Sequence, residues 1–307
     1  MNLLGVISSC GVRACLFEVS AGKPGNVSPG RGFERTSYGD FVRGSRALRF
    51  VFKESVLRGF KVGGGDLAID SIGVGSLIKD SVLAVRSSHR GGNTHLGIIM
   101  LLVPLAVGAG FCIGSGVGFE RLRFCAGKVM LGTTVKDSLD VFDAICLANP
   151  GGLGKSRLDV RDGKSRIKLR ERSLTLLDVM SFSSRKDRIA GELASGFPVV
   201  FNFVVPNLRK NLKKTKNIKK AIVQTYLQTL AKHPDSLISR KVGLRKSKSV
   251  SIKARKIVNQ GGVFTKKGRA SIKEFDLLLR SEGNKLNPGT TADLIAAGLF
   301  IHLLLGK

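Results

Sequence analysis

The amino-acid sequence predicts an all-α fold, a compact multi-helix globular domain built around a buried central hydrophobic helix. Apolar residues recur at helical spacing nearly throughout, whereas the alternation typical of strands is scarce. Helix boundary signals agree, because Thr134 and Asp137 form a capping-box pattern and His233-Pro234 ends a helical segment. These patterns predict roughly ten helices and an all-α architecture.

The spacing of apolar residues predicts particular helices along the chain. The first ends near Glu18, where a carboxylate opposes the helix dipole. A later helix ends at Asn149-Pro150-Gly151-Gly152. Three further helical faces consist of Val135, Leu139, Phe142 and Cys146, of Ile218, Ile222, Thr225 and Tyr226, and of Ile272, Phe275 and Leu279.

The stretch from Leu96 to Phe119 predicts the central helix. It has no charged side chain and is long enough to cross a bilayer core of about 30 Å. It also contains Pro104 and six glycines, with charged residues close to both ends. We expect a buried helix followed by a glycine-rich connection and no membrane span, with a membrane protein as the alternative.

Length and composition are those of a folded globular protein. The chain has 307 residues, of which 43% are apolar and 24% charged, so a sizeable core can form. Few long linkers interrupt the helical pattern. We expect residues 1–307 to form a single all-helical domain, with the basic segment 207–220 as its weakest joint.

The net charge of +29 predicts partners that carry phosphate groups. Basic residues are dense in 207–220 and 240–256, which we interpret mainly as solvated surface. Aromatic residues make up only 6% of the chain and none punctuates these runs, so stacking platforms for single-stranded nucleic acid are missing. Charge alone leaves nucleic acid, an acidic membrane surface and phosphorylated metabolites as candidate partners, and the missing stacking platforms mean that we expect no specific nucleic acid.

The cysteines and the first residues favour a cytoplasmic protein. Five cysteines are scattered without a paired Cys-x-x-Cys spacing, and we interpret them as reduced. The first basic residue is Arg13, so the basic cluster that opens a secretory signal is missing.

The segment from Pro150 to Ser156 resembles a phosphate-binding P-loop only at its Gly-Lys-Ser end. The motif needs a glycine at the position of Asn149 and a buried strand before it, and the sequence predicts neither. We therefore exclude a working P-loop.

Three turns lead directly into strong helices through small polar residues, and each is a candidate anion site. They are Gly91 to His95, Asp235-Ser236 and Asn287 to Asp293. Helix starts offer free N–H groups and the positive end of the dipole, and Arg90, Arg240, Lys241 and Lys285 stand beside them. Ordinary helix capping is the alternative at each place.

Three titratable residues can each be interpreted either as structural residues or as catalytic residues. His95 at the mouth of an apolar helix suits a hydrogen-bonded structural residue as well as a catalyst. Asp293, placed in the first turn of the last helix, suits dipole complementation as well as chemistry. Glu18 is the stronger functional candidate, because its position is unfavourable for the dipole.

Taken together, four ordered segments resemble the triphosphoribosyl-dephospho-CoA synthase family over nearly the whole chain. They are EVSAGKPGNV (18–27), GGNTHLG (91–97), DSLISRKVG (235–243) and NPGTTADL (287–294). The third departs from the family's Asp-Thr-Asn-Leu pattern, since it has Ser236 and no following Asn.

The resemblance implies a pentosyltransferase. The family reaction joins the ribose 2′-hydroxyl of 3′-dephospho-CoA to the anomeric carbon of the ribose of ATP and expels adenine, in the biosynthesis of a prosthetic group. Because the transition state resembles an oxocarbenium ion, carboxylates near that carbon help. The catalytic candidates are Glu18, His95, Asp235 and Asp293, with Glu18 or His95 as general base.

The resemblance also implies residues for binding ATP, a dephospho-CoA-like nucleotide and Mg²⁺. Asp235 and Asp293 would hold the ion that neutralises the triphosphate. The candidates for substrate binding are Lys23, Asn26, Asn93, Thr94, Arg240, Lys241, Asn287 and Thr291.

Two alternatives to the family reaction stay open besides the membrane protein. The Lys-Pro-Gly-Asn-Val and Asp-Ser-Leu-Ile variants look like an archaeal branch, whose members could act on another phosphorylated nucleotide or pentose in coenzyme biosynthesis. A basic RNA-binding protein is the other, and only the charge favours it.

Overall fold

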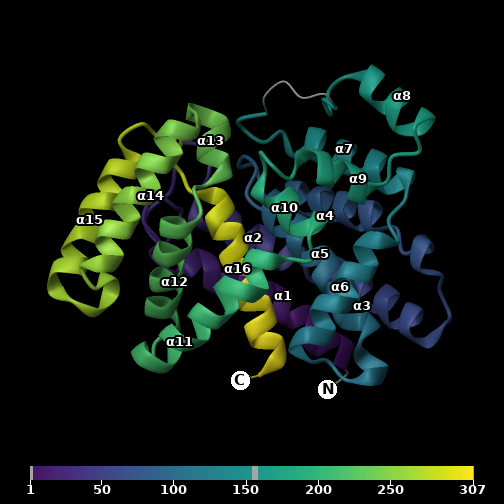
Figure 1. Cartoon of the computed structure of the whole chain (residues 1–307), viewed down its shortest axis with the longest axis horizontal. Helices are drawn as coiled ribbons and strands as arrows, with labels where there is room; N and C mark the ends of the chain where they lie inside the picture. The colour runs from purple at the N-terminus through teal and green to yellow at the C-terminus, as the bar shows by residue number, and fades with distance from the viewer. Residues whose placement is uncertain (1–2, 154–157, 307) are drawn as a thin grey trace.

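The computed structural model describes residues 3–153 and 158–306, and the regular secondary structure in this part of the chain is helical (Figure 1). Two isolated β-bridges, Ser28 to Arg31 and Phe33 to Thr36, lie in the loop after the first helix. The all-α prediction is confirmed, with more helices than the sequence predicts. The Gly-Lys-Ser end of the P-loop-like segment lies outside the described residues.

The first half of the chain forms α1 (Leu3–Ser20), α2 (Tyr38–Ala47), α3 (Arg49–Gly64), α4 (Val74–Ser88), α5 (Leu96–Phe111), α6 (Phe119–Leu131) and α7 (Val135–Ala148). The second half forms α8 (Gly163–Glu171), α9 (Leu176–Ser183), α10 (Arg188–Ala194), α11 (Val205–Thr215), α12 (Ile218–Lys232), α13 (Ser236–Val242), α14 (Leu244–Asn259), α15 (Lys266–Arg280) and α16 (Gly289–Leu305). Short 3₁₀ turns occupy Ile69–Ser71, Ile113–Ser115 and Gly262–Phe264, and a π-helical turn, Val200–Val204, leads into α11.

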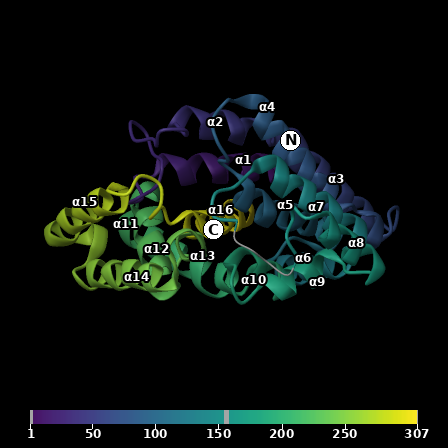
Figure 2. The same cartoon turned by 90° about the horizontal axis from the view of Figure 1, so that it is seen from above.

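Helix α16 runs through the middle of the molecule. Figure 2 shows α1 on one side of it and α10 and α13 on the other, and α16 contacts all three helices as well as α5. Helices α3 to α9 gather at one end, and α11 to α15 form a lobe at the other (Figure 1).

Helix α5 is the buried central helix that the sequence predicts. Every residue from Ile98 to Gly110 is buried. The apolar stretch then breaks into the 3₁₀ turn and a glycine-rich connection before α6 starts at Phe119, as expected. The sequence did not single out α16 as a second core helix, although Leu294 to Ile301 are also all buried.

Among the described residues, one helix is long and apolar enough to cross a membrane by length and composition. This helix is α1, and 44% of its apolar window is buried inside the protein. A buried core helix meets the same criteria, so the observation is weak support for a span. Helices α5 and α16 are shorter apolar helices.

Glycines allow α5 to pack backbone against backbone on α3. A Cβ atom at Gly59 would lie 1.9 Å from the carbonyl oxygen of Val107, and one at Gly110 would lie 2.1 Å from that of Val56. Such distances are far inside van der Waals contact, so any side chain at these positions would push the two helices apart.

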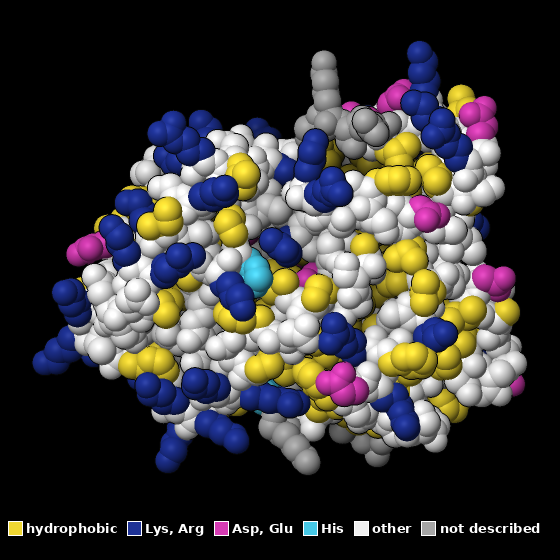
Figure 3. All heavy atoms as spheres, in the orientation of Figure 1, with side chains coloured by type: hydrophobic (Ala, Val, Ile, Leu, Met, Phe, Trp, Pro, Cys, Tyr) yellow, Lys and Arg dark blue, Asp and Glu magenta, His cyan; other side chains and the backbone are white. Residues whose placement is uncertain are grey.

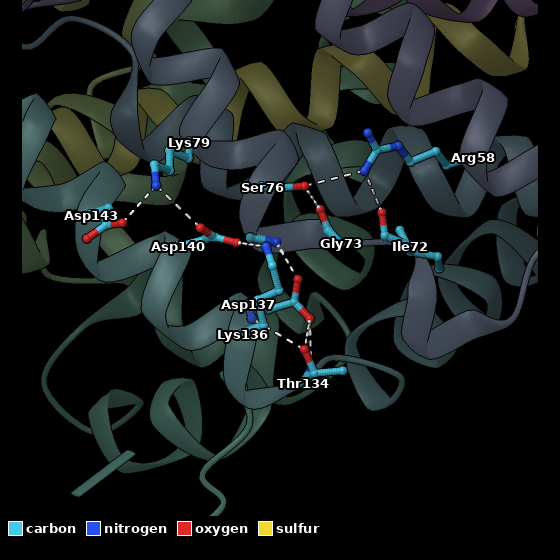
Figure 4. Close-up of polar contacts among 11 residues, drawn as sticks. Arg58, Ile72, Gly73, Ser76, Lys79, Thr134, Lys136, Asp137, Asp140 and Asp143 are labelled. Carbon is cyan, nitrogen blue, oxygen red and sulfur yellow. Dashed lines mark hydrogen bonds and ion pairs between the residues drawn. The ribbon is translucent and has the colours of Figure 1, made fainter. Parts of the chain in front are cut away.

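A polar network joins α4 to α7 (Figure 4). The predicted capping box is confirmed, since Thr134 donates to Asp137 Oδ2 from its backbone nitrogen at 2.7 Å and from its hydroxyl at 2.9 Å. The other oxygen of Asp137 accepts the N–H of Gly75 at 2.7 Å. Lys79 extends the contact by ion pairs with two further carboxylates of α7. This network fixes the position of α4.

The basic segment 207–220 forms α11 from its third residue on, a two-residue connection and the start of α12. Asn211 of α11 donates to Thr225 Oγ1 at 3.0 Å and to Gln228 Oε1 at 2.8 Å, so the two helices are tied together. The division of the chain into domains stays a prediction.

Positive charge is concentrated in the second half of the chain. Residues 205–285 contain 22 Lys and Arg against four Asp and Glu. Most of these residues belong to α11 to α15, over which Figure 3 shows Lys and Arg side chains spread across the visible face. We name this part of the molecule, residues 205–285, the basic lobe.

We expect Gly59→Ala to lower the free energy of unfolding by about 1–3 kcal/mol, because the new methyl group meets the backbone of α5. Gly127→Ala on α6 is the matched control, since a Cβ there meets nothing within 4 Å, and helix propensity predicts a gain of roughly 0.5–1 kcal/mol. Urea denaturation measures both. Equal stability of the two variants would contradict the close packing of α3 on α5.

Candidate active site

The four predicted segments meet where α1 ends and where α13 and α16 begin, beside the start of α5. Four carboxylates interact electrostatically there, although they come from distant parts of the sequence: Glu18, Asp187, Asp235 and Asp293. We name them the carboxylate cluster.

Asp293 is the carboxylate of the cluster that remains available to a ligand. It is the fifth residue of α16, beyond the first turn, so the prediction that placed it in that turn was wrong and capping does not explain it. Its side chain is only partly buried, and no N–H or O–H group of the described residues donates to it. Burial, and then the negative charges of Glu18 and Asp235, raise the pKa of Asp293 well above its ordinary value.

The carboxylate of Asp293 lies directly on the first turn of α5. A Cβ atom at Gly97 would be 2.0 Å from Asp293 Oδ2, so only glycine leaves room for the carboxylate here. The last glycine of the GGNTHLG segment, Gly97, is thus required for packing, because it lets α16 place Asp293 against the start of α5.

Glu18 and Lys23 form a buried ion pair within the first segment. Glu18 Oε1 lies 2.8 Å from Lys23 Nζ, and the exposed fractions of the two side chains are 4% and 0%. The ammonium group also contacts the carbonyl oxygens of Glu18 and Ala21. Because an unpaired charge at this depth would be costly, each residue holds the other in place at the end of α1.

Asp235 has the geometry of a structural clamp. Its Oδ1 accepts the N–H groups of Leu237 at 2.9 Å and Ile238 at 3.1 Å, which caps α13. Its Oδ2 accepts the N–H of Thr291 at 2.7 Å and the hydroxyl of the same residue at 2.8 Å. Both oxygens are therefore occupied, which disfavours the predicted roles of Asp235 as metal ligand and catalytic group. The same bonds give Thr291 a structural role.

His95 is part of a closed hydrogen-bond chain. The N–H of Gly91 donates to His89 Nδ1 at 3.1 Å, so His89 Nε2 carries the proton and donates to Thr94 Oγ1 at 3.2 Å. The Thr94 hydroxyl then donates to His95 Nδ1 at 2.6 Å, and His95 Nε2 donates to Ser45 Oγ at 3.0 Å.

The environment keeps His95 neutral. Burial lowers the pKa of His95 to about 3, and His89 adds to this effect. Because both ring nitrogens already have partners, the structure favours His95 as a structural residue over His95 as general base.

The remaining predicted substrate-binding residues lie at the same junction but mostly have protein partners. Asn93 Oδ1 accepts the N–H of Leu96 at 3.2 Å, and Asn26 donates to the hydroxyl of Tyr226 at 2.7 Å. Asn287 accepts the N–H of Gly289 through its main-chain carbonyl at 2.9 Å. These bonds shape the loops, and the side chain of Asn287 stays open to a ligand.

The two cations of α13 also have partners. Arg240 pairs with Asp187, the N-cap of α10, and Lys241 donates to the carbonyl of Asn284 at 2.8 Å. Burial lowers the pKa of Lys241. The positive charge near the carboxylate cluster is therefore largely used within the protein.

Sequence reasoning missed three residues of this region: Asp187, Tyr226 and His89. Asp187 precedes a short helix and could have been found as a cap, but its contact with Arg240 spans 53 positions. Tyr226 links Asn26 to the carbonyl of Pro24 from 200 positions away. No local pattern indicates contacts of this kind.

The fit of a magnesium ion depends on Asp293. The described residues include no group of three His, Cys, Asp or Glu side chains placed to hold a metal. Mg²⁺ in nucleotide sites is commonly held by one or two carboxylates and by substrate phosphates. The free carboxylate of Asp293 fits that case.

The fold and site define an all-helical protein with an acidic site at converging helix ends. A family model described as ATP:dephospho-CoA triphosphoribosyl transferase matches residues 5–307. The chain belongs to this family.

Two similar proteins agree with this assignment, and one solved structure has a similar fold. The 2-(5''-triphosphoribosyl)-3'-dephosphocoenzyme-A synthase of Klebsiella pneumoniae is 26% identical over 69% of this chain, which spans only 61% of that protein. A "Probable 2-(5''-triphosphoribosyl)-3'-dephosphocoenzyme-A synthase" of Malonomonas rubra is 25% identical over 74% of this chain and 75% of its own. The crystal structure of a proposed triphosphoribosyl-dephospho-CoA synthase from Archaeoglobus fulgidus, 24% identical, has a similar fold. It covers 84% of this chain and 99% of its own, with a TM-score of 0.58.

We expect Asp293→Asn to raise the melting temperature at neutral pH. The folded-state pKa of Asp293 is raised, so above the ordinary value of 3.8 the folded protein binds more protons than the unfolded one, and its stability falls as pH rises. Asparagine removes this penalty, and the difference from wild type should shrink towards pH 4.

Thermal unfolding of both proteins between about pH 4 and pH 8 measures the effect over the window that the raised pKa defines. Asp66→Asn, on an exposed loop, is the control and should melt like wild type. A lower melting temperature of Asp293→Asn at every pH would instead show that the carboxylate supports the fold.

Proposed function

We propose that the protein transfers the triphosphoribosyl group of ATP to the ribose 2′-hydroxyl of 3′-dephospho-CoA and releases adenine. The family match over residues 5–307 supports this reaction. The observation that carries it in this chain is Asp293, a carboxylate with a raised pKa and no protein donor, at the point where all four segments meet.

Asp293 and Glu18 divide the chemistry in this proposal. As the bond from the anomeric carbon to adenine breaks, its electron pair leaves with adenine, which takes up a proton from water. The carbon becomes positively charged, and the carboxylate of Glu18 stabilises that charge. The 2′-hydroxyl oxygen forms the new bond and passes its proton to Asp293, since a raised pKa suits a general base at neutral pH.

Mg²⁺, which the family reaction with ATP implies, would be held by substrate phosphates and would neutralise their charge. In this proposal Asp293 acts as the base and does not bind the ion, because a cation on its carboxylate would lower its pKa. In our proposal Asp235 does not touch the ion, because its oxygens cap α13 and bind Thr291. It positions Asp293 by holding the start of α16. His95 positions the 89–95 loop in the same indirect way.

The identity of the acceptor, 3′-dephospho-CoA, is also a proposal. The sequence departure at Ser236 falls on an inter-helix contact, since its hydroxyl accepts the N–H of Arg188 at 3.2 Å and lies 3.1 Å from Thr290 Oγ1. It therefore gives no reason to assign a different acceptor. We also propose the archaeal branch, on the Lys-Pro-Gly-Asn-Val and Asp-Ser-Leu-Ile variants of the sequence. Free cysteines support a cytoplasmic location.

The direct test incubates the purified protein with ATP, Mg²⁺ and 3′-dephospho-CoA and measures free adenine by chromatography and the coupled product by mass. We expect adenine release that depends on dephospho-CoA. Asp293→Asn should lower kcat by at least roughly 100-fold, because a general base is lost. The Asp66→Asn control should keep the wild-type rate.

Adenine that appears without the acceptor would mean hydrolysis of ATP and not transfer. If the folded wild type releases no adenine with dephospho-CoA present, the proposed reaction is wrong. The alternative, a reaction on another phosphorylated nucleotide or pentose, then replaces it.

We further expect Gly97→Ala to lower kcat/KM by about 100-fold, because its methyl group displaces the carboxylate of Asp293, and small displacements of catalytic groups cost that much. The fold should persist, since the neighbouring group is a side chain that can move. Gly127→Ala is again the control. A Gly97→Ala variant with full activity would place Asp293 outside the reaction.

A further inference from the structure

A second polar site is formed in part by the loop before α5, the loop that leads to Gly97 and the carboxylate cluster. It is an open cleft of about 560 Å³ between the loop after α1 and the loop before α5. Its volume falls within the range of roughly 300–1,000 Å³ that is typical of ligand sites. It is lined by Phe33, Glu34, Arg35, Thr36, Ser37, Asp40, Arg43, His89, Arg90 and Gly91.

The cleft contains guanidinium groups that the protein itself does not neutralise. Arg35 and Arg90 are exposed and form no ion pair with any described carboxylate, whereas Arg43 pairs with Asp40. In the carboxylate cluster, by contrast, Lys23 and Arg240 are both paired. Free guanidinium groups for the charge of a phosphorylated substrate therefore lie in the cleft.

The chemistry of the cleft matches phosphate oxygens. Guanidinium groups donate paired N–H bonds to phosphate in a fixed planar geometry. Glu34 is the remaining unpaired charged group of the lining, and an exposed carboxylate beside phosphates can share a divalent cation with them.

The walls of the cleft are held before any ligand binds. Within the loop after α1, Phe33 and Thr36 exchange backbone hydrogen bonds of 2.8 and 3.1 Å. Arg280 of α15 donates to the carbonyl of Gly32 at 3.1 Å and lies 5.0 Å from the centre of the Phe33 ring. The N–H of Gly92 donates to the carbonyl of Arg35 at 2.9 Å, which ties one wall to the other. A preformed site loses less entropy when it binds.

The cleft connects to the carboxylate cluster through the loop before α5. His89 lines the cleft and begins the hydrogen-bond chain through Thr94 to His95. Two residues further on, Gly97 contacts Asp293. A substrate that spans this loop would place its phosphates on one side and its ribose on the other.

We propose that this cleft binds the polyphosphate of a nucleotide substrate, with Arg35 and Arg90 as its charged ligands. The inference rests on the proposed function for the identity of the nucleotide, because the triphosphate of ATP and the diphosphate of dephospho-CoA share the same chemistry. The site itself rests on the cleft and its unpaired arginines.

Binding without turnover tests the site. Inorganic tripolyphosphate is titrated by calorimetry into the full-length wild type, Arg35→Gln, Arg90→Gln and the control Arg49→Gln, an exposed arginine at the start of α3. Loss of one charged hydrogen-bond donor should raise the Kd by roughly 10-fold to 100-fold, and the control should bind like wild type. Tripolyphosphate binding that is equal in all four proteins would overturn the proposal.

Separate titrations with ATP and with 3′-dephospho-CoA then identify the source of the phosphates. Weaker ATP binding alone in Arg35→Gln and Arg90→Gln assigns the cleft to the triphosphate, and weaker dephospho-CoA binding alone assigns it to the acceptor. If neither nucleotide is affected, the cleft is not a substrate site. Because these readouts need no adenine release, a failure of the transferase assay leaves the result interpretable.

Discussion

The carboxylate of Asp235 holds the starts of two helices at one point, and the geometry of the candidate site depends on that joint. Four donors from α13 and α16 converge on its two oxygens. A buried carboxylate with fewer partners would be costly, so the bonds and the burial require each other. The start of α16 is thereby fixed, and Asp293 lies two residues beyond the Thr291 that Asp235 binds. Substituting Asp235 would displace Asp293 while leaving the carboxylate of Asp293 in the protein.

The fold was largely predictable from the sequence because its determinants are local. Helical spacing, the capping box at Thr134 and the break at His233-Pro234 all act within a few residues, and each is confirmed. The central helix was predictable for the same reason, since its uncharged apolar run is continuous in the sequence and Ile98 to Gly110 are all buried. The packing of α3 on α5 was not, because the need for glycine at Gly59 depends on a backbone more than 40 positions away.

The candidate site was predictable as a set of segments but not as a set of roles. Glu18, Asp235 and Asp293 do meet, yet sequence alone could not tell a carboxylate filled by four donors from one with none. The role of His95 depends on Ser45, 50 positions earlier. The arginines of the cleft could not be predicted from a sequence pattern. Arg35 and Arg90 line one cleft only because the two loops are joined by the hydrogen bond from Gly92 to the carbonyl of Arg35.

The uneven distribution of charge makes the basic lobe more strongly positive than the rest of the molecule. The basic lobe carries 22 Lys and Arg and only four Asp and Glu, while the candidate site next to it is built from carboxylates. A polyanion approaching in solution therefore experiences a torque before it touches the surface, and collisions are biased towards one side. Such long-range guidance fades beyond about 8–10 Å at physiological salt. The rate at which polyanions reach the candidate site is consequently a property of the whole second half of the chain, including helices that lie away from that site.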